Sequence, residues 1–360
     1  MEVLKQWFRR YFSDPQVVSL LLILLFAFIL IRTLGSTLSP VLTAVVIAYL
    51  LQSPIRWFEN LGIPSLISVI LVFVLFLAVM VFILVWLIPE LLQQVPTFFT
   101  EFPNFVDKSK KQLVEWLTSL EAKYKFVSNN EIEKIIADIN NEFKVKGQEI
   151  TKAVLNINNV QHVVFLLVFV LLLPLLVFFF LKDKGKIINW MKSFYPKDMG
   201  LTSTVWRDLN EQIGNYVRGK IFEILLVWLV TYIVFLSLGM PYPLLLAGMV
   251  GLSALIPYIG AVVVTIPVVL VAYATFNGFT PTFWWVIGLY ALIQTVDGIV
   301  VVPLLFSEVV KLHPVAIVVA VLVFGGAWGF WGVFFAIPLA SLVQAIINAW
   351  PRTAVLAKPP

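Results

Sequence analysis

Long apolar stretches separated by short polar connections dominate this chain. A helix of roughly 20 apolar residues is needed to cross the ~30 Å hydrocarbon core of a bilayer. On that criterion the pattern predicts six membrane-spanning helices, and the chain is expected to be an all-α polytopic membrane protein. The predicted spans lie near residues 16–32, 36–53, 65–88, 160–181, 221–239 and 283–303.

Two further charge-free stretches, Pro243 to Tyr273 and Pro314 to Trp350, are too long for one ordinary span. Each is interrupted near its centre, at residues 256–260 and 325–332, by proline or clustered glycine, which kink or end helices. The arms are marginal for a full crossing, so the pattern favours two broken, re-entrant hairpins. Non-helical tips at membrane depth must be buried in protein or line a cavity.

The two hairpins share a repeat of 71 residues, which separates Pro243 from Pro314 and Pro267 from Pro338. One ordinary span precedes each hairpin, so a duplication of this unit would be inverted in the membrane. Inverted repeats with broken helices are typical of transporter binding sites. The resulting segments are three N-terminal helices (1–89), a polar amphipathic helical insertion (90–159), a fourth helix with a basic connection (160–220), and the repeat units 221–281 and 282–360.

Composition and charge support this class. Hydrophobic residues make up 61% and charged residues 12% of the chain, and the mean hydropathy is +0.97, which excludes an ordinary soluble domain. The N-terminal Lys5, Arg9 and Arg10 and the basic 182–220 connection are expected to be cytoplasmic, together with the N-terminus. We therefore interpret the net charge of +5 as a topology signal and expect no nucleic-acid partner. A cleavable N-terminal signal is the weaker alternative, because another apolar span follows at once.

Asp297 ends a run without any charged residue or histidine that begins at Ile224. A carboxylate inside a membrane helix is a candidate functional group by default. The alternative is a buried acid that only locks helices together. Gln294 lies three residues earlier on the same helical face and could share a ligand with Asp297. Alternatively, it could form an ordinary hydrogen bond between helices.

The hairpin tips supply the other candidate ligands. Their backbone groups could face a polar substrate, although small residues also let membrane helices approach closely. The candidates at the first tip are Pro257, Tyr258 and Gly260, and those at the second tip are Gly325, Gly326 and Gly329.

Catalytic and cofactor motifs are missing from the sequence. We find no phosphate-binding loop, dinucleotide fingerprint or zinc-protease motif, so we expect no enzyme, no cofactor and no metal site. An intramembrane aspartyl protease would need a second acid beside Asp297, and none lies in the broken stretches or in the helix of Asp297. Arg218 and Glu223 are expected to form an anchoring pair. A membrane scaffold that recruits partners through residues 90–159 is a third reading.

Several motifs, taken together in order and spacing, resemble the AI-2E family, also called the autoinducer-2 exporter family or PerM-type permeases. Asp297 stands where many members carry Glu, and Ala261 where Pro is frequent. The motifs are Tyr216-Val217-Arg218-Gly219, Leu238-Gly239-Met240-Pro241-Tyr242, Ile256-Pro257-Tyr258-Ile259-Gly260, Asp297-Gly298 with Val302-Pro303, Leu312-His313-Pro314, Gly325-Gly326 and Ala336-Ile337-Pro338-Leu339.

The resemblance implies a transporter in the plasma membrane of a prokaryote, working as a homo-oligomer with the hairpins in an elevator-like moving unit. Family members are described as exporters of autoinducer-2 or as Na⁺(Li⁺)/H⁺ antiporters, so it leaves the substrate open. The sequence thus predicts a secondary-active transporter of a small hydrophilic molecule or a cation. Its substrate is expected between the hairpin tips, with Asp297 in ion coupling and membrane lipid around the helices.

Overall fold

The computed structural model describes residues 38–124, 134, 137–138, 141–142, 145–149, 160–193, 200–257, 259–306 and 313–349. Within these ranges every regular element is helical, so the predicted all-α fold class is confirmed. The α-helices are α3 (Ser39–Asn60), α4 (Ser65–Phe82), α5 (Ile88–Tyr124), α7 (Val160–Lys182), α8 (Lys184–Ser193), α9 (Gly200–Ser237), α10 (Pro243–Ser253), α11 (Ile259–Thr275), α12 (Pro281–Val296), α13 (Val302–Phe306), α14 (Pro314–Phe334) and α15 (Ala336–Ala349); η1 (Ile83–Leu87) and η2 (Asp297–Val301) are π-helical turns.

Five described helices are long and apolar enough to cross a membrane, as a polytopic protein requires. Four of them overlap the predicted spans 36–53, 65–88, 221–239 and 283–303, and α7 covers the predicted span 160–181. The fifth is α14, which comes from the second broken stretch. The predicted span 16–32 lies outside the described residues. The five helices are Ser39–Asn60, Ser65–Lys108, Ile213–Ser237, Pro281–Phe306 and Pro314–Phe334.

The third predicted span continues well past its expected end. The elements α4, η1 and α5 form one helical run from Ser65 to Tyr124, so the helix enters the polar segment without a break. The amide of Ile88 donates to the carbonyl of Ile83, a π-type bond. Pro89 is tolerated because this π turn has already interrupted the regular hydrogen-bond pattern just before it.

The chain divides into two compact units. Unit 1 comprises residues 1–72, 171–219 and 306–360, and unit 2 comprises residues 73–170 and 220–305. The first hairpin, made of α10 and α11, therefore belongs to unit 2. The second hairpin, made of α14 and α15, belongs to unit 1.

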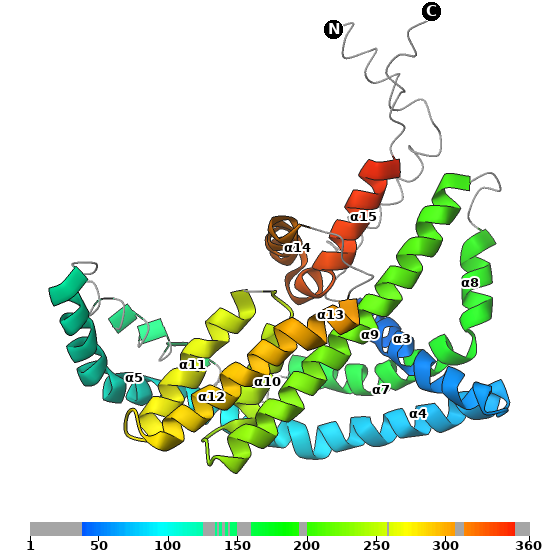
Figure 1. Cartoon of the computed structure of the whole chain (residues 1–360). Helices are drawn as coiled ribbons and strands as arrows, with labels where there is room; N and C mark the ends of the chain where they lie inside the picture. Colours follow the sequence, from blue (N-terminus) through cyan, green and yellow to red (C-terminus); the bar gives the residue numbers. More distant parts are fainter. Residues whose placement is uncertain are drawn as a thin grey trace, which may run out of the picture. The chain divides into compact units, whose positions relative to one another are not determined.

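Unit 2 is built around the first hairpin. The arms α10 and α11 pack on each other, and α11 also packs on α5 and α12 (Figure 1). Phe98 and Phe102 of α5 are only 1% and 2% exposed in this core. The beginning of the polar segment therefore supports the hairpin. Other buried members of the core are Val227, Phe235, Leu246, Val250, Val268, Val271, Val286 and Tyr290.

Polar side chains of α5 also hold the N-terminal end of α10. The side-chain oxygen of Gln94 accepts a hydrogen bond from the amide of Leu245 at 3.1 Å, an amide that a helix start leaves without an intrahelical partner. The hydroxyl of Tyr242 donates to the carboxylate of Glu101 at 2.5 Å. Burial and this hydrogen bond raise the pKa of Tyr242, so its phenol stays a neutral donor.

The break in the first hairpin falls where Pro257 predicts it. The amides of residues 254–256 each donate to the carbonyl three residues earlier, so α10 tightens into a 3₁₀-like turn before the chain reverses. Gly260 then passes very close to the first arm. A Cβ atom on Gly260 would lie 1.9 Å from the carbonyl oxygen of Ser253, so a larger residue could not be accommodated without a backbone shift.

The break in the second hairpin is narrower than predicted. Gly325 and Gly326 lie within α14, and inside that helix only Gly329 departs from helical geometry, with φ 59° and ψ −134°. That conformation suits glycine because it has no side chain to clash. Here too the arms meet closely, since a Cβ atom on Gly332 would lie 1.8 Å from the carbonyl oxygen of Phe324.

The two hairpins share this construction at nearly the predicted spacing. Each first arm starts with a proline in its first turn, and the two carbonyls approached by glycine belong to Ser253 and Phe324, which are 71 residues apart. The approaching glycines, Gly260 and Gly332, are 72 apart, so the second break holds one more residue. These likenesses support the predicted repeat, whose inversion in the membrane stays a prediction.

Alanine at either close-approach glycine should destabilise the protein. For Gly260→Ala and Gly332→Ala we expect a loss of about 1–3 kcal/mol in the free energy of unfolding, the usual range for overpacking. Unfolding in detergent micelles titrated with SDS would measure it. Gly326→Ala is the matched control, because no atom lies within 4 Å of the position of its Cβ. Equal effects at Gly326 and Gly332 would contradict the close-approach interpretation.

In unit 1 the second hairpin is held by aromatic packing. The ring of Tyr216 in α9 contacts the rings of Phe306 and Phe334, with centroids 5.7 and 6.4 Å apart. The indole N–H of Trp331 donates to the hydroxyl of Ser39 at 3.4 Å. The part of α14 that follows the break at Gly329 therefore contacts α3 and α9.

Candidate functional site

Asp297 is the first residue of the π-helical turn η2, within the apolar helical run Pro281–Phe306. One of its carboxylate oxygens, Oδ1, is buried and has no hydrogen-bond partner among the described residues. Such an oxygen is costly to bury, and native structures usually satisfy it. Single π turns occur frequently at functional sites. Both observations favour a functional role for Asp297 over a purely structural one.

A buried ion pair on α9 lies in the same unit. The ammonium of Lys220 donates to both carboxylate oxygens of Glu223, at 3.1 and 2.9 Å. Lys220 is 4% and Glu223 2% exposed. Charges buried to this degree occur in proteins only when they are paired or otherwise compensated.

These three charged residues form one electrostatic cluster. Asp297 interacts favourably with the charge of Lys220 and unfavourably with that of Glu223. With both acids ionised, the cluster holds one positive and two negative charges. A proton or a monovalent cation bound at Asp297 would bring its net charge to zero. We refer to Lys220, Glu223 and Asp297 as the charge cluster.

Gln294 is connected to the first hairpin through a tyrosine. The hydroxyl of Tyr290 hydrogen-bonds the hydroxyl of Thr265 on α11 at 2.8 Å, and the side chain of Gln294 acts electrostatically on the same Tyr290 hydroxyl. The Tyr290–Thr265 hydrogen bond ties the helix that carries Asp297 to the second arm of the hairpin. Gln294 also lies 71 residues after Glu223. In the predicted repeat, the unit 282–360 therefore carries an amide at the position where the unit 221–281 carries the buried acid.

The first hairpin tip uses its own backbone groups. The amide of Ile259 donates to the carbonyl of Pro257, and the amide of Gly260 donates to that of Ile256. In this conformation these two amides are not available to a ligand, and close packing alone requires glycine at position 260. Tyr258 lies outside the described residues. Of the first-tip candidates, the described Pro257 and Gly260 share unit 2 with Asp297 and Gln294.

The candidates at the second tip belong to unit 1. Gly326 and Gly329 are exposed, and neither has an atom within 4 Å of the position of a Cβ. At Gly325 a Cβ would meet the side chain of Val333 at 2.8 Å, so its lack of a side chain serves packing between the arms.

One sequence-based pairing was wrong. Arg218 does not anchor Glu223; its guanidinium donates to the side-chain oxygen of Asn215 at 2.6 Å, while Glu223 pairs with Lys220. The Lys-x-x-Glu spacing was the available signal, because residues three apart lie on one helical face. The signal is masked in the sequence because Lys220 also ends the basic 182–220 connection, whose lysines and arginines indicate a cytoplasmic location.

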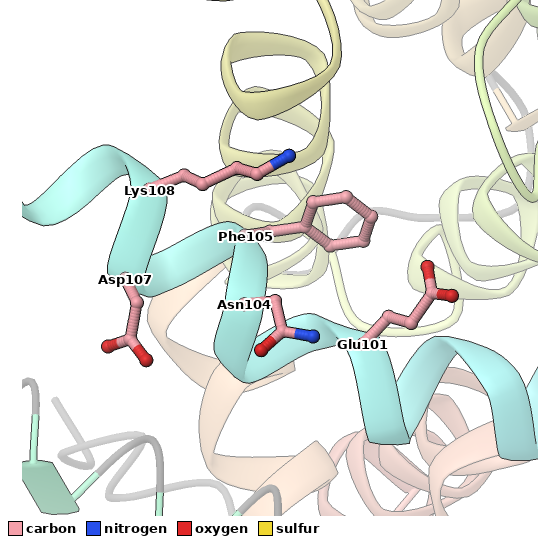
Figure 2. Close-up of a pocket in the computed structure, with 5 residues that line it drawn as sticks. All are labelled: Glu101, Asn104, Phe105, Asp107 and Lys108. Atoms are coloured by element: carbon pink, nitrogen blue, oxygen red, sulfur yellow. The ribbon is translucent and has the colours of Figure 1, made fainter.

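A separate hollow of about 680 Å³ lies on α5 and is lined by Glu101, Asn104, Phe105, Asp107 and Lys108 (Figure 2). Figure 2 shows Phe105 and Glu101 on one side of the helix and Asp107 pointing away from them. Glu101 already accepts the hydroxyl of Tyr242, and Phe105 packs edge-on against the ring of Tyr242. This hollow therefore lies beside the α5 residues that contact Tyr242 at the start of the first hairpin. Among the described residues, no three His, Cys, Asp or Glu side chains are grouped so as to hold a metal.

Comparison with known proteins agrees with this architecture. The chain matches the family profile described as "AI-2E family transporter" over residues 18–352. It is 40% identical over 352 residues to the Escherichia coli K12 protein named "Putative permease PerM", covering 98% of both chains. It is 25% identical to a "Putative transport protein" of Thermotoga maritima, covering 96% of this chain and 97% of the relative. For "Putative transport protein YrrI" of Bacillus subtilis the identity is 24%, with 86% and 85% covered.

Proposed function

Since this chain belongs to the AI-2E family of transporters, we propose that it is a secondary-active transporter whose flux is coupled to a proton or sodium ion at Asp297. Its substrate class is a small hydrophilic molecule of the autoinducer-2 type, moved outward. The plasma membrane of a prokaryote, with the N-terminus in the cytoplasm, is the location we assign.

The observation that carries this proposal is the charge balance of the charge cluster. Lys220 and Glu223 neutralise each other through two hydrogen bonds, which leaves the charge of Asp297 and its unpartnered buried oxygen. A coupling cation would satisfy both at once. Acids within membrane helices commonly mark such ion pathways.

A second candidate function is Na⁺(Li⁺)/H⁺ exchange, which the charge balance of the charge cluster also favours. If one carboxylate can hold either one proton or one alkali cation, the two ions compete for it. That competition alone is sufficient for antiport when the site faces the two sides of the membrane in turn. The substrate would then be the cation itself, with no organic molecule required.

The hairpins supply the conformational change in either case. Broken helices near the membrane midplane form the moving parts or gates of many transporters. The Tyr290–Thr265 hydrogen bond joins the Asp297 helix to α11, so ion binding at Asp297 could be transmitted to the first hairpin. We expect an elevator-like motion within a homo-oligomer.

An intramembrane protease is the reading that the charge cluster disfavours. Aspartyl proteases need two carboxylates that share a proton. Glu223 is the second acid near Asp297, but both of its oxygens are bound by Lys220. We therefore propose no catalytic role for either acid.

The proposal is tested by flux in proteoliposomes that contain the purified protein. Autoinducer-2, Na⁺ and Li⁺ are compared under an imposed proton gradient, with protein-free liposomes as the control. We expect gradient-dependent flux of at least one of the three, abolished when an ionophore collapses the gradient. Flux of autoinducer-2, with or without accompanying Na⁺ movement, supports the exporter, and flux of Na⁺ or Li⁺ without autoinducer-2 flux supports the exchanger. Absence of gradient-dependent flux for all three would overturn the proposal.

A further inference from the structure

In unit 1 the ammonium of Lys184 is influenced by the charges of two arginines that belong to other helices. Lys184, at the start of α8, donates to the side-chain oxygen of Gln52 in α3 at 3.0 Å. Gln52 lies one helical turn before Arg56. Lys184 also interacts electrostatically with both Arg56 and Arg218. We refer to Arg56, Lys184 and Arg218 as the basic cluster.

The basic cluster has more positive than negative charge. Glu59 is the acid that acts favourably on Lys184. The neighbouring Asp183 is occupied by Lys186, which it contacts at 2.9 Å, and Arg218 donates to the neutral Asn215. Burial, followed by repulsion from Arg56 and Arg218, lowers the pKa of Lys184. Like charges held together in this way are stabilised when an anion binds between them.

The cluster lies where apolar helices end. Arg56 is four residues before the end of α3, Lys184 comes two residues after the end of α7, and Arg218 is near the start of the apolar run Ile213–Ser237. The short helix α8 combines basic residues with the exposed Ile188 and Trp190, as helices in the membrane interface do. Trp57, beside Arg56, is 59% exposed, and tryptophan is enriched at lipid headgroup level.

We propose that Arg56, Lys184 and Arg218 bind the phosphate group of an anionic phospholipid. Arginine and lysine are the residues that recognise phosphate. Basic pockets between membrane helices bind anionic headgroups in this way. The lipid's acyl chains would extend from the basic cluster along the apolar surfaces of α3 and α7. The site is independent of the proposed transport function, because it lies in unit 1 and includes no residue of the charge cluster.

Thermal unfolding of the full-length protein in detergent tests this site. We expect phosphatidylglycerol to raise the unfolding midpoint more than phosphatidylcholine does. In Arg56→Gln and Lys184→Gln, the phosphatidylglycerol concentration that gives half of the maximal rise in the unfolding midpoint should increase about fivefold for each basic residue removed. Lys186→Gln is the control with the same charge change, because Lys186 is exposed and engaged with Asp183. An equal response to both lipids, or an equal loss in Lys186→Gln, would overturn the proposal.

A variant that strengthens lipid binding separates the proposed site from a general folding defect, which could only weaken it. Glu59→Gln removes the acid that offsets the cluster, so it should lower the phosphatidylglycerol concentration needed. Glu149→Gln, an exposed acid in unit 2, should leave it unchanged. Inorganic phosphate forms a separate arm. Stabilisation by phosphate alone that equals that of phosphatidylglycerol would support the phosphate site but overturn the lipid as its ligand.

Discussion

Replacing Asp297 by Asn should reduce gradient-driven flux in proteoliposomes to the level of protein-free liposomes. The amide keeps the size of the side chain but cannot lose a proton or attract a cation, so the charge cluster is neutral whether or not an ion is present. Folding should be little affected, because the substitution removes a buried charge without creating a cavity.

Two controls sharpen this test. Asp297→Glu keeps the charge and introduces the residue that many members of the family carry, so it should retain coupled flux. Asp107→Asn removes an exposed acid from α5 by the same chemical change and should leave flux at the wild-type level. Wild-type flux in Asp297→Asn, measured at equal amounts of reconstituted protein, would contradict the proposed role of Asp297 in ion coupling.

Replacing Lys220 alone by Met should strongly destabilise unit 2. The variant leaves Glu223 only 2% exposed and without its cation, and breaking a buried ion pair from one side typically costs about 3–5 kcal/mol. SDS titration in detergent micelles would measure this loss. A loss below about 1 kcal/mol would show that the pair is not maintained in the folded protein, since exposed pairs contribute that little.

The double variant Lys220→Met with Glu223→Leu should recover most of that stability, because apolar residues of similar volume often replace a buried pair without loss. It also tests the charge balance. Removing one positive and one negative charge leaves the net charge of the cluster unchanged, with Asp297 as its only acid. We therefore expect the double variant to retain gradient-dependent flux. Loss of flux in a stable double variant would assign Lys220 or Glu223 a direct role in transport.

The spans and the hairpin breaks could be predicted because their causes are local. A helix of given length either matches the bilayer or does not, and Pro257 interrupts hydrogen bonds wherever the fold places it. The second break was predicted too broadly for the same local reason. Glycine permits a break but does not impose one, so Gly325 and Gly326 stay helical while Gly329 does not.

The partners of Asp297 could not be predicted in this way. Membrane helices such as α10 and α12 are apolar all round, so their sequence pattern does not say which face turns toward a neighbour. Lys220 and Glu223 are about 75 residues from Asp297 in the chain, and only the tertiary fold of unit 2 gives them a common electrostatic environment. Likewise, the need for glycine at position 260 comes from the carbonyl of Ser253 across the hairpin.

The sequence by itself thus determined that this is an all-α polytopic membrane protein with two broken stretches and one acid in an apolar helix. Hydropathy and backbone chemistry act over a few residues, and they suffice for those conclusions. Only the tertiary structure decided that Asp297 shares its surroundings with a buried Lys220–Glu223 pair, and that the charges of Arg56 and Arg218 both act on Lys184 in unit 1. Electrostatic energy depends on distances between groups, and those distances are fixed by helix packing.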